Sequence, residues 1–125
     1  MKEIILISAA VFGALTVVIG AFGAHALKKI FSEDQLKSFE TGVKYQMYHA
    51  LALLILGFQL DFLNTMEKIM GWSFIVGIIL FSFSIYGLTI SGAKGKKMTF
   101  LGPVTPLGGL LLLTGWVLLL ATFLN

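Results

Sequence analysis

The chain has 125 residues, enough for one domain, and it carries a formal net charge of +3. Apolar residues make up 58% of it and charged residues only 12%, which is about half the charged share of soluble domains. Because so few polar side chains cannot cover a protein of this size in water, the composition excludes an ordinary soluble domain and predicts an integral membrane protein.

Four apolar segments follow one another along the chain. A helix needs about 20 residues to cross the hydrocarbon core, with a range of about 17–25, so each segment is long enough to span. Helices also satisfy their own backbone hydrogen bonds in lipid, which makes a sheet unnecessary. The sequence therefore predicts an all-α membrane protein, a four-transmembrane-helix bundle in a single domain over residues 1–125. The segments are residues 4–27, 47–63, 69–93 and 98–124.

The first segment is interpreted as a retained transmembrane helix. The apolar part of a secretory signal has about 7–15 residues, and this segment is longer, although residues 24–26 have the Ala-x-Ala form of a cleavage site. Small residues recur along it at helical spacing, a pattern typical of close packing between membrane helices. The packing positions predicted here are Gly13, Gly20, Gly23 and Ala24.

The polar segment that follows has the pattern of an amphipathic helix over residues 33–44. Ser32 suits the N-cap position and Gln35 suits position N3 of a capping box. Apolar residues recur every three or four positions, which indicates a short helix in the membrane interface that bends at Gly42 into the second span. The alternative is one long helix that protrudes straight from the membrane.

The span predicted within the fourth segment is shorter than the segment itself, because a proline marks where the helix begins. In Thr105-Pro106, the threonine suits an N-cap and the proline suits the first helical position, so the span is predicted over residues 106–124. Gly108 and Gly109 lie just inside it, where glycine permits close packing between helices. Their backbone at a helix N-terminus is also compatible with anion binding, on weaker grounds.

The lysines predict the orientation in the membrane. Seven of the nine lie in the segment between the first two spans or in the loop after the third span. The positive-inside rule then places both of these loops in the cytoplasm and both termini outside.

Four motifs occur in order along the chain: GAFGAHAL at residues 20–27, FETGVKYQMYHALALL at 39–54, FSFSIY at 81–86 and TPLGGLLLLTGW at 105–116. Together they closely resemble the DUF423 family of small bacterial membrane proteins, the YwdK- and YgdD-like proteins, over essentially the whole chain. The resemblance implies a four-span protein of the bacterial cytoplasmic membrane with no assigned reaction. Phe83 stands where the family pattern usually has glycine.

Polar residues at the ends of the spans are predicted to meet on the cytoplasmic side of the membrane. Three of them, on the second span, share a helical face because they are three and four residues apart. They can form hydrogen bonds between helices or a small-ligand or proton site, and the two histidines can be considered as haem or metal ligands. The candidate cluster is His25, Tyr45, Gln46, His49, Tyr86 and Thr105.

No set of residues in the sequence indicates a reaction. It has no cysteine, no Ser-His-Asp set, no phosphate-binding glycine loop and no metal motif, and the absence of arginine disfavours a nucleic-acid partner. We expect a non-catalytic protein without cofactor or metal, which acts through helix packing or by binding membrane lipids, a second copy or another membrane protein. One alternative is a small oligomeric channel or transporter with a polar site at His25 and His49. Another is a haem- or quinone-linked redox component that uses the same two histidines.

Overall fold

The computed structural model describes residues 1–125, apart from the side chain of Ala24. Regular structure in the described residues is helical throughout, which confirms the predicted all-α class. The segments are α1 (Lys2–Val18), the π-helical η1 (Ile19–Gly23), α2 (Ala24–Leu27), α3 (Glu33–Gln59), α4 (Thr65–Ile78), the π-helical η2 (Ile79–Phe83), α5 (Ser84–Ala93), the 3-10 helix η3 (Thr99–Leu101) and α6 (Val104–Leu124).

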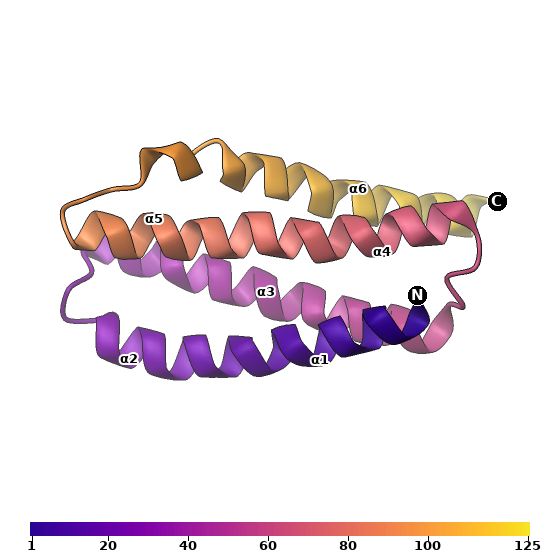
Figure 1. Cartoon of the computed structure of the whole chain (residues 1–125), viewed down its shortest axis with the longest axis horizontal. Coiled ribbons are helices and arrows are strands. Elements are labelled where there is room, and N and C mark those ends of the chain that lie inside the picture. The colour runs from indigo at the N-terminus through magenta and orange to yellow at the C-terminus, as the bar shows by residue number, and fades with distance from the viewer.

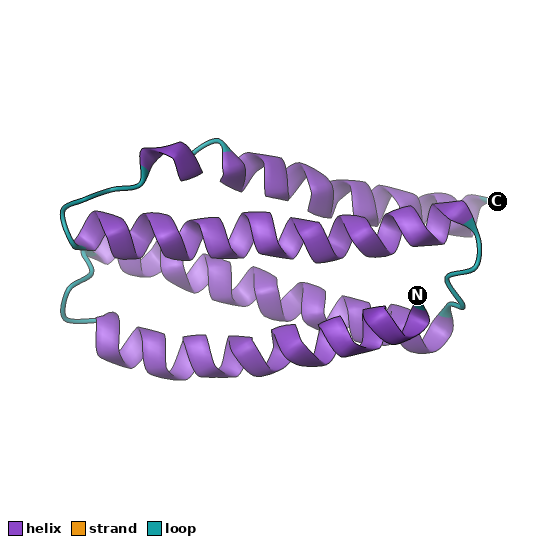
Figure 2. Ribbon diagram, viewed as in Figure 1, coloured by secondary structure: helices purple, strands orange, loops and turns teal.

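These segments form rods that run side by side in alternating directions (Figure 1). α1, η1 and α2 make the first rod, α3 the second, α4, η2 and α5 the third, and α6 the fourth. Short loops join them (Figure 2). Both termini and the α3–α4 turn lie at one end of the bundle, whereas the α2–α3 and α5–η3 loops lie at the other end (Figure 1).

In the described part of the chain, three helical stretches are long and apolar enough to cross a membrane, namely Lys2–Leu27, Thr65–Ala93 and Thr99–Leu124. α3 has the length, but charged and polar residues are frequent in its first half. Length and composition therefore identify three candidate spans, where the sequence predicted four.

The predicted bend at Gly42 is wrong, because α3 runs without interruption from Glu33 to Gln59. The capping box does form: the Gln35 N–H donates to Ser32 Oγ at 3.2 Å, and the Ser32 N–H donates to Gln35 Oε1 at 2.9 Å. A Cβ at Gly42 would lie 2.9 Å from the Tyr86 ring, so glycine serves close packing between α3 and α5 here. Residues 33–44 are thus the first part of one long helix and form no separate interfacial helix.

The fourth helix begins at Val104, two residues before the predicted start. The Thr105 side chain forms no cap and instead lies with its hydroxyl 2.5 Å from the Ser84 hydroxyl. α6 also approaches the third rod very closely. A Cβ at Gly108 would overlap the backbone nitrogen of Phe81 and lie 2.7 Å from the carbonyl carbon of Leu80, so only glycine fits where α6 crosses η2.

The apolar core fills the half of the bundle nearest the termini. It is built from α1, the second half of α3, the α3–α4 turn, α4 and one residue of α6: Ile5, Ala9, Phe12, Ala50, Leu53, Leu56, Phe62, Met70, Phe74, Ile75, Ile78 and Leu112. Most buried polar side chains lie in the middle and in the other half, among them Gln46, His49, Ser82, Ser84 and Thr89. The polar chemistry of the molecule is therefore concentrated toward the end that carries the lysine-rich loops.

Candidate functional site

α3 presents two buried polar residues to the interior of the bundle. Gln46 is fully buried and His49 is 5% exposed. They are three residues apart and therefore share a face of the helix. Because α3 packs against α1 on one side and against the third rod on the other, this face can reach partners on several helices.

Gln46 links three rods through its side-chain amide. Its Nε2 donates to the carbonyl oxygen of Phe12 in α1 at 3.0 Å, and its Oε1 accepts from the Tyr86 hydroxyl in α5 at 2.7 Å. The partners fix the orientation of the amide, since a carbonyl oxygen can only accept a hydrogen bond. The Tyr86 ring packs against Phe39 with 5.2 Å between centroids. Gln46 and Tyr86 therefore form a hydrogen-bonded bridge between helices.

His49 uses both of its ring nitrogens. Nδ1 lies 2.7 Å from the carbonyl oxygen of Tyr45, and Nε2 lies 3.0 Å from Nε1 of Trp116 in α6. A carbonyl cannot donate and an indole N–H cannot accept, so the proton lies on Nδ1 and Nε2 accepts from Trp116. No lone pair of the ring is then free to bind a haem iron or a metal ion. No local pattern in the sequence marks Trp116 for this role, because its partner lies 67 positions away in the chain.

Tyr45 contributes its backbone and its ring to this region. Its side chain is 40% exposed, and its ring stacks on Phe81 of η2 with 4.9 Å between centroids. The centroid of the His49 ring lies 6.1 Å from that of the Tyr45 ring. Tyr45 thus covers the outer side of the His49–Trp116 pair.

His25 does not meet the other members of the candidate cluster. It is exposed at the end of the first rod and lines a cavity of about 290 Å³ with Lys28 and Glu40. His49 lies about 24 Å along α3 from the start of that helix, at 1.5 Å per residue. The turn between α2 and α3 therefore returns the chain near His25 and leaves His49 deep in the bundle.

Thr105 also lies apart from Gln46 and His49. Its hydroxyl pairs with that of Ser84, which joins the beginning of α6 to α5. A further hydroxyl, that of Ser82, donates to the carbonyl oxygen of Gly42 at 2.7 Å. Ser82 and Ser84 belong to the FSFSIY motif, so the motif itself pointed to two interhelical contacts that the candidate cluster did not include.

The glycines of the first rod differ in their surroundings. A Cβ at Gly23 would lie 2.6 Å from the Phe39 ring, and one at Gly20 would lie 3.2 Å from Cγ1 of Val43. Both glycines therefore lie where this rod packs against α3. Gly13, in contrast, has open space where its Cβ would be.

Two further predicted packing positions are Gly109 and Ala24. Gly109 follows Gly108 directly, yet a Cβ there would make only an ordinary contact of 3.7 Å with the Phe81 ring. The packing predicted for the Ala24 side chain falls outside the described residues.

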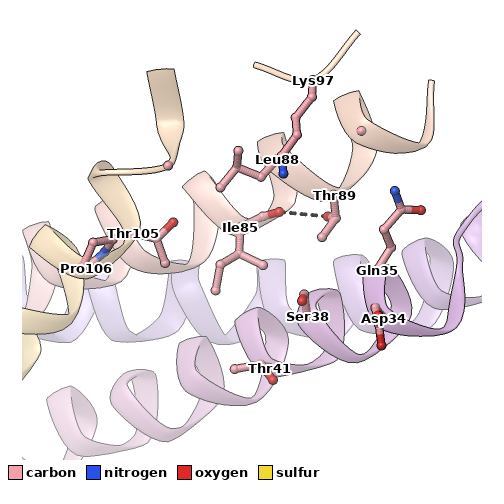
Figure 3. A pocket seen from close by; sticks show the side chains of 12 residues that line it. Asp34, Gln35, Ser38, Thr41, Ile85, Leu88, Thr89, Lys97, Thr105 and Pro106 are labelled. Atoms are coloured by element: carbon pink, nitrogen blue, oxygen red, sulfur yellow. Dashed lines mark hydrogen bonds between the residues drawn. The ribbon is translucent and has the colours of Figure 1, made fainter. Parts of the chain in front are cut away.

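A cavity of about 540 Å³ lies between α3, α5 and the beginning of α6 (Figure 3). Of the candidate cluster, only Thr105 lines it. The α3 wall is formed by residues four and three apart, a spacing that places them on one helical face and that the sequence already contained. The lining residues are Asp34, Gln35, Ser38 and Thr41 from α3, Ile85, Leu88, Thr89 and Gly92 from α5, Lys97 and Gly102 from the segment that leads into α6, and Thr105 and Pro106 from the first turn of α6.

The buried polar atoms are satisfied inside the protein. Among the described residues, every buried side-chain nitrogen or oxygen has a hydrogen-bond partner. Over the same residues, no group of three or more His, Cys, Asp or Glu side chains is placed to hold a metal ion. The arrangement around Gln46 and His49 can therefore tie helices together, while the cavity at Thr105 has room for a ligand.

Comparison with known proteins finds similarity over almost the whole chain. A family described as "Protein of unknown function (DUF423)" matches residues 19–109. The UPF0382 membrane protein YwdK of Bacillus subtilis is 36% identical over 119 residues, which are 94% of this chain and 93% of the relative. A UPF0382 membrane protein of Staphylococcus aureus is 39% identical over 122 residues, 97% of this chain and 96% of its own.

The similarity extends beyond bacteria. A UPF0382 membrane protein of the yeast Schizosaccharomyces pombe is 39% identical over 113 residues, which cover 90% of this chain and 94% of the relative. No solved structure matches the chain.

Proposed function

The chain belongs to the DUF423 family of membrane proteins, and on that premise we propose that it is a four-span, non-catalytic component of the bacterial cytoplasmic membrane that binds lipid or a partner protein. One observation carries the proposal: Gln46, Tyr86 and His49 each form a hydrogen bond to another helix of the bundle. Such residues hold membrane helices together at roughly 0.6–2 kcal/mol each. They are then not available as acids, bases or ligands for a reaction.

Connectivity supports α3 as the second of the four spans. The first rod ends at one end of the bundle, and the third rod begins at the other end (Figure 1). If both of these rods cross the membrane, α3 must return the chain across it, since only short loops flank this helix. The polar residues Gln46 and His49 face the interior of the bundle, which reduces the cost of placing α3 in lipid.

The distribution of lysines supports an orientation with both termini outside. The end of the bundle with the α2–α3 and α5–η3 loops has Lys28, Lys29, Lys94, Lys96 and Lys97 in or next to these loops. Lys37 lies in the second turn of α3, and Lys44 lies two turns further along that helix. The end with the termini has Lys2 and Lys68, and Lys2 lies 3.8 Å from Asp61. The positive-inside rule places the lysine-rich end in the cytoplasm.

The lack of cysteine makes a labelling test straightforward, because any introduced thiol is the single one in the chain. We expect a cysteine at Leu63 in the α3–α4 turn to react with a membrane-impermeant maleimide in intact cells. A cysteine replacing Lys29, in the turn before α3, should react only after permeabilisation. Labelling of both positions from the same side would contradict α3 as a span, and the reversed pattern would contradict the orientation.

A small oligomeric channel or transporter is the second candidate function, and the cavity of about 540 Å³ at the lysine-rich end favours it. Proteoliposomes distinguish the two functions by flux of protons, fluoride and small cations. A non-catalytic packing or binding component gives no flux above that of empty liposomes. Flux that His49→Ala or His25→Ala abolishes would instead establish the transport function.

A further inference from the structure

The cavity between α3, α5 and the beginning of α6 combines charged, polar and apolar groups in one lining (Figure 3). We propose that it binds the headgroup of a zwitterionic membrane phospholipid with a primary ammonium and a phosphodiester, the phosphoethanolamine class. This inference rests on the proposed membrane orientation, because that orientation puts the lysine-rich end of the bundle at the level of the cytoplasmic headgroups.

The depth of the cavity fits a lipid headgroup. Asp34 is the second residue of α3, and Thr41 lies about 10 Å further along the helix at 1.5 Å per residue. The polar layer on each side of a bilayer is roughly 5–8 Å thick, outside a hydrocarbon core of about 30 Å. The rim of the cavity at Asp34 therefore lies among the headgroups, and its inner part at Thr41 reaches the edge of the hydrocarbon.

Two charged groups of opposite sign lie in the lining, Asp34 on α3 and Lys97 in the loop after α5. In the part of the chain that the structure describes, the ion pairs are Lys2–Asp61 and Lys37–Glu33, so neither lining charge is paired within the protein. A ligand with one positive and one negative group matches this pair. A headgroup with a phosphate alone would meet the repulsion of Asp34.

The neutral groups add acceptors that suit an ammonium. The hydroxyl of Thr41 donates its proton to the carbonyl oxygen of Lys37 at 3.0 Å. The hydroxyl of Thr89 donates to the carbonyl oxygen of Ile85 at 2.8 Å, the bond drawn in Figure 3. With their protons engaged, these two oxygens offer lone pairs to the cavity.

Donors for a phosphate come from two other side chains. The Gln35 carbonyl oxygen accepts from the Ser32 N–H in the capping box, so its amide N–H groups remain to donate. Lys97 supplies an ammonium, which forms charge-assisted hydrogen bonds with phosphate oxygens. The lining thus holds separate groups for each half of a zwitterion.

The lining also distinguishes between headgroups. Quaternary ammonium groups such as choline are bound over aromatic faces, and no aromatic ring is among the described residues that line this cavity. A primary ammonium instead needs hydrogen-bond acceptors, which Thr41 and Thr89 provide. Ile85, Leu88 and Pro106 give an apolar wall for the glycerol and the first acyl carbons.

The test is lipid retention by the purified full chain in a mild detergent, measured by native mass spectrometry. Phosphatidylethanolamine, phosphatidylcholine and phosphatidylglycerol with identical acyl chains are offered together. We expect the ethanolamine lipid to be retained roughly threefold or more over either competitor, as for one or two partly exposed charged contacts. Equal retention of the three lipids would overturn the inference.

Matched variants separate the site from general charge. Lys97→Gln should remove most of the preference, whereas Lys96→Gln, the same change one position away and outside the lining, should keep it. Asp34→Asn should lower the retention of phosphatidylethanolamine and raise that of phosphatidylglycerol, because the variant no longer repels the phosphate. Glu33→Gln removes the same charge from the first turn of α3 and serves as its control. Equal effects within either pair would count against the site.

Two further outcomes assign the ligand and separate the hypotheses. Displacement of the lipid by equimolar soluble glycerophosphoethanolamine would assign the site to a free metabolite and overturn the lipid assignment. Retention of the lipid in the presence of the soluble compound would support the assignment to a membrane lipid. Correct cysteine labelling without any lipid preference would refute this inference and leave the four-span proposal standing, whereas failed labelling would refute that proposal itself.

Discussion

The indole of Trp116 donates a hydrogen bond of 3.0 Å to Nε2 of His49, across 67 positions of sequence. This bond joins α6 to α3, and the stacked rings of Tyr45 and Phe81 lie beside it. The hydrogen bond thus holds α6 against α3, and the stacked rings hold α3 against η2. None of these four side chains is among the described residues that line the cavity at Thr105, so the bond belongs to the packed part of the bundle.

Trp116→Phe should destabilise the bundle because His49 Nε2 loses its donor in an apolar environment. We expect a loss of about 0.5–1.5 kcal/mol in the free energy of unfolding. Denaturation with sodium dodecyl sulfate, followed by circular dichroism in mixed micelles, measures it. Trp72→Phe is the control, since the two tryptophans are similarly exposed, 47% for Trp72 and 45% for Trp116. Equal losses in the two variants would show that ring size, and not the hydrogen bond, determines the effect.

Gln46→Leu should lower the free energy of unfolding by about 1–3 kcal/mol, because it leaves the Tyr86 hydroxyl buried without its acceptor. Tyr86→Phe should cost less, since the Gln46 amide keeps its bond to the Phe12 carbonyl. The double variant should be more stable than the sum of the two losses predicts, with a coupling of about 0.5–2 kcal/mol. Strict additivity of the two single losses would contradict the bridge.

Gly108→Ala and Gly109→Ala should differ although the residues are neighbours. A Cβ at Gly108 meets the backbone of η2, which cannot move aside as a flexible side chain can, so we expect a loss of about 2 kcal/mol or more. At Gly109 the contact of 3.7 Å is ordinary, and the change should be within about 0.5 kcal/mol of neutral. Thermal unfolding in detergent compares the two, with Gly13→Ala as a second neutral control. A neutral Gly108→Ala would mean that α6 does not cross η2 at this residue.

Haem should not bind through His25 and His49. His49 has both nitrogens in hydrogen bonds, and His25 lies in a separate place at the end of the first rod. Purified protein supplied with haem should show no Soret band beyond that of free haem. A histidine-ligated spectrum that disappears in His49→Ala would contradict the hydrogen bonding described for this ring. His25→Ala, at an exposed position, should leave the unfolding free energy within about 0.5 kcal/mol of the parent chain.

The sequence supported the helical class and the local features of the helices well. The apolar segments anticipated where the rods lie, and the Ser32–Gln35 capping box forms as predicted, because both features depend on residues close in the chain. Gly42 shows the limit of such reasoning. A glycine inside a helical pattern suggested a bend, but its position against Tyr86 made it a packing residue in an unbroken helix.

By itself, the sequence determined that this is an all-helical membrane protein of the DUF423 family, since composition, apolar length and ordered motifs are properties of the chain alone. Only the tertiary structure decided which polar groups meet. The π-helical segments η1 and η2 each add a residue to a helical turn, which rotates the following face by about 100°. Helical counting across η2 therefore cannot assign the face on which Tyr86 lies, and the pairing of Trp116 with His49 depends on how the separate helices α6 and α3 pack. The cavity likewise depends on how α3, α5 and α6 are spaced, and no local pattern in the sequence specifies that spacing.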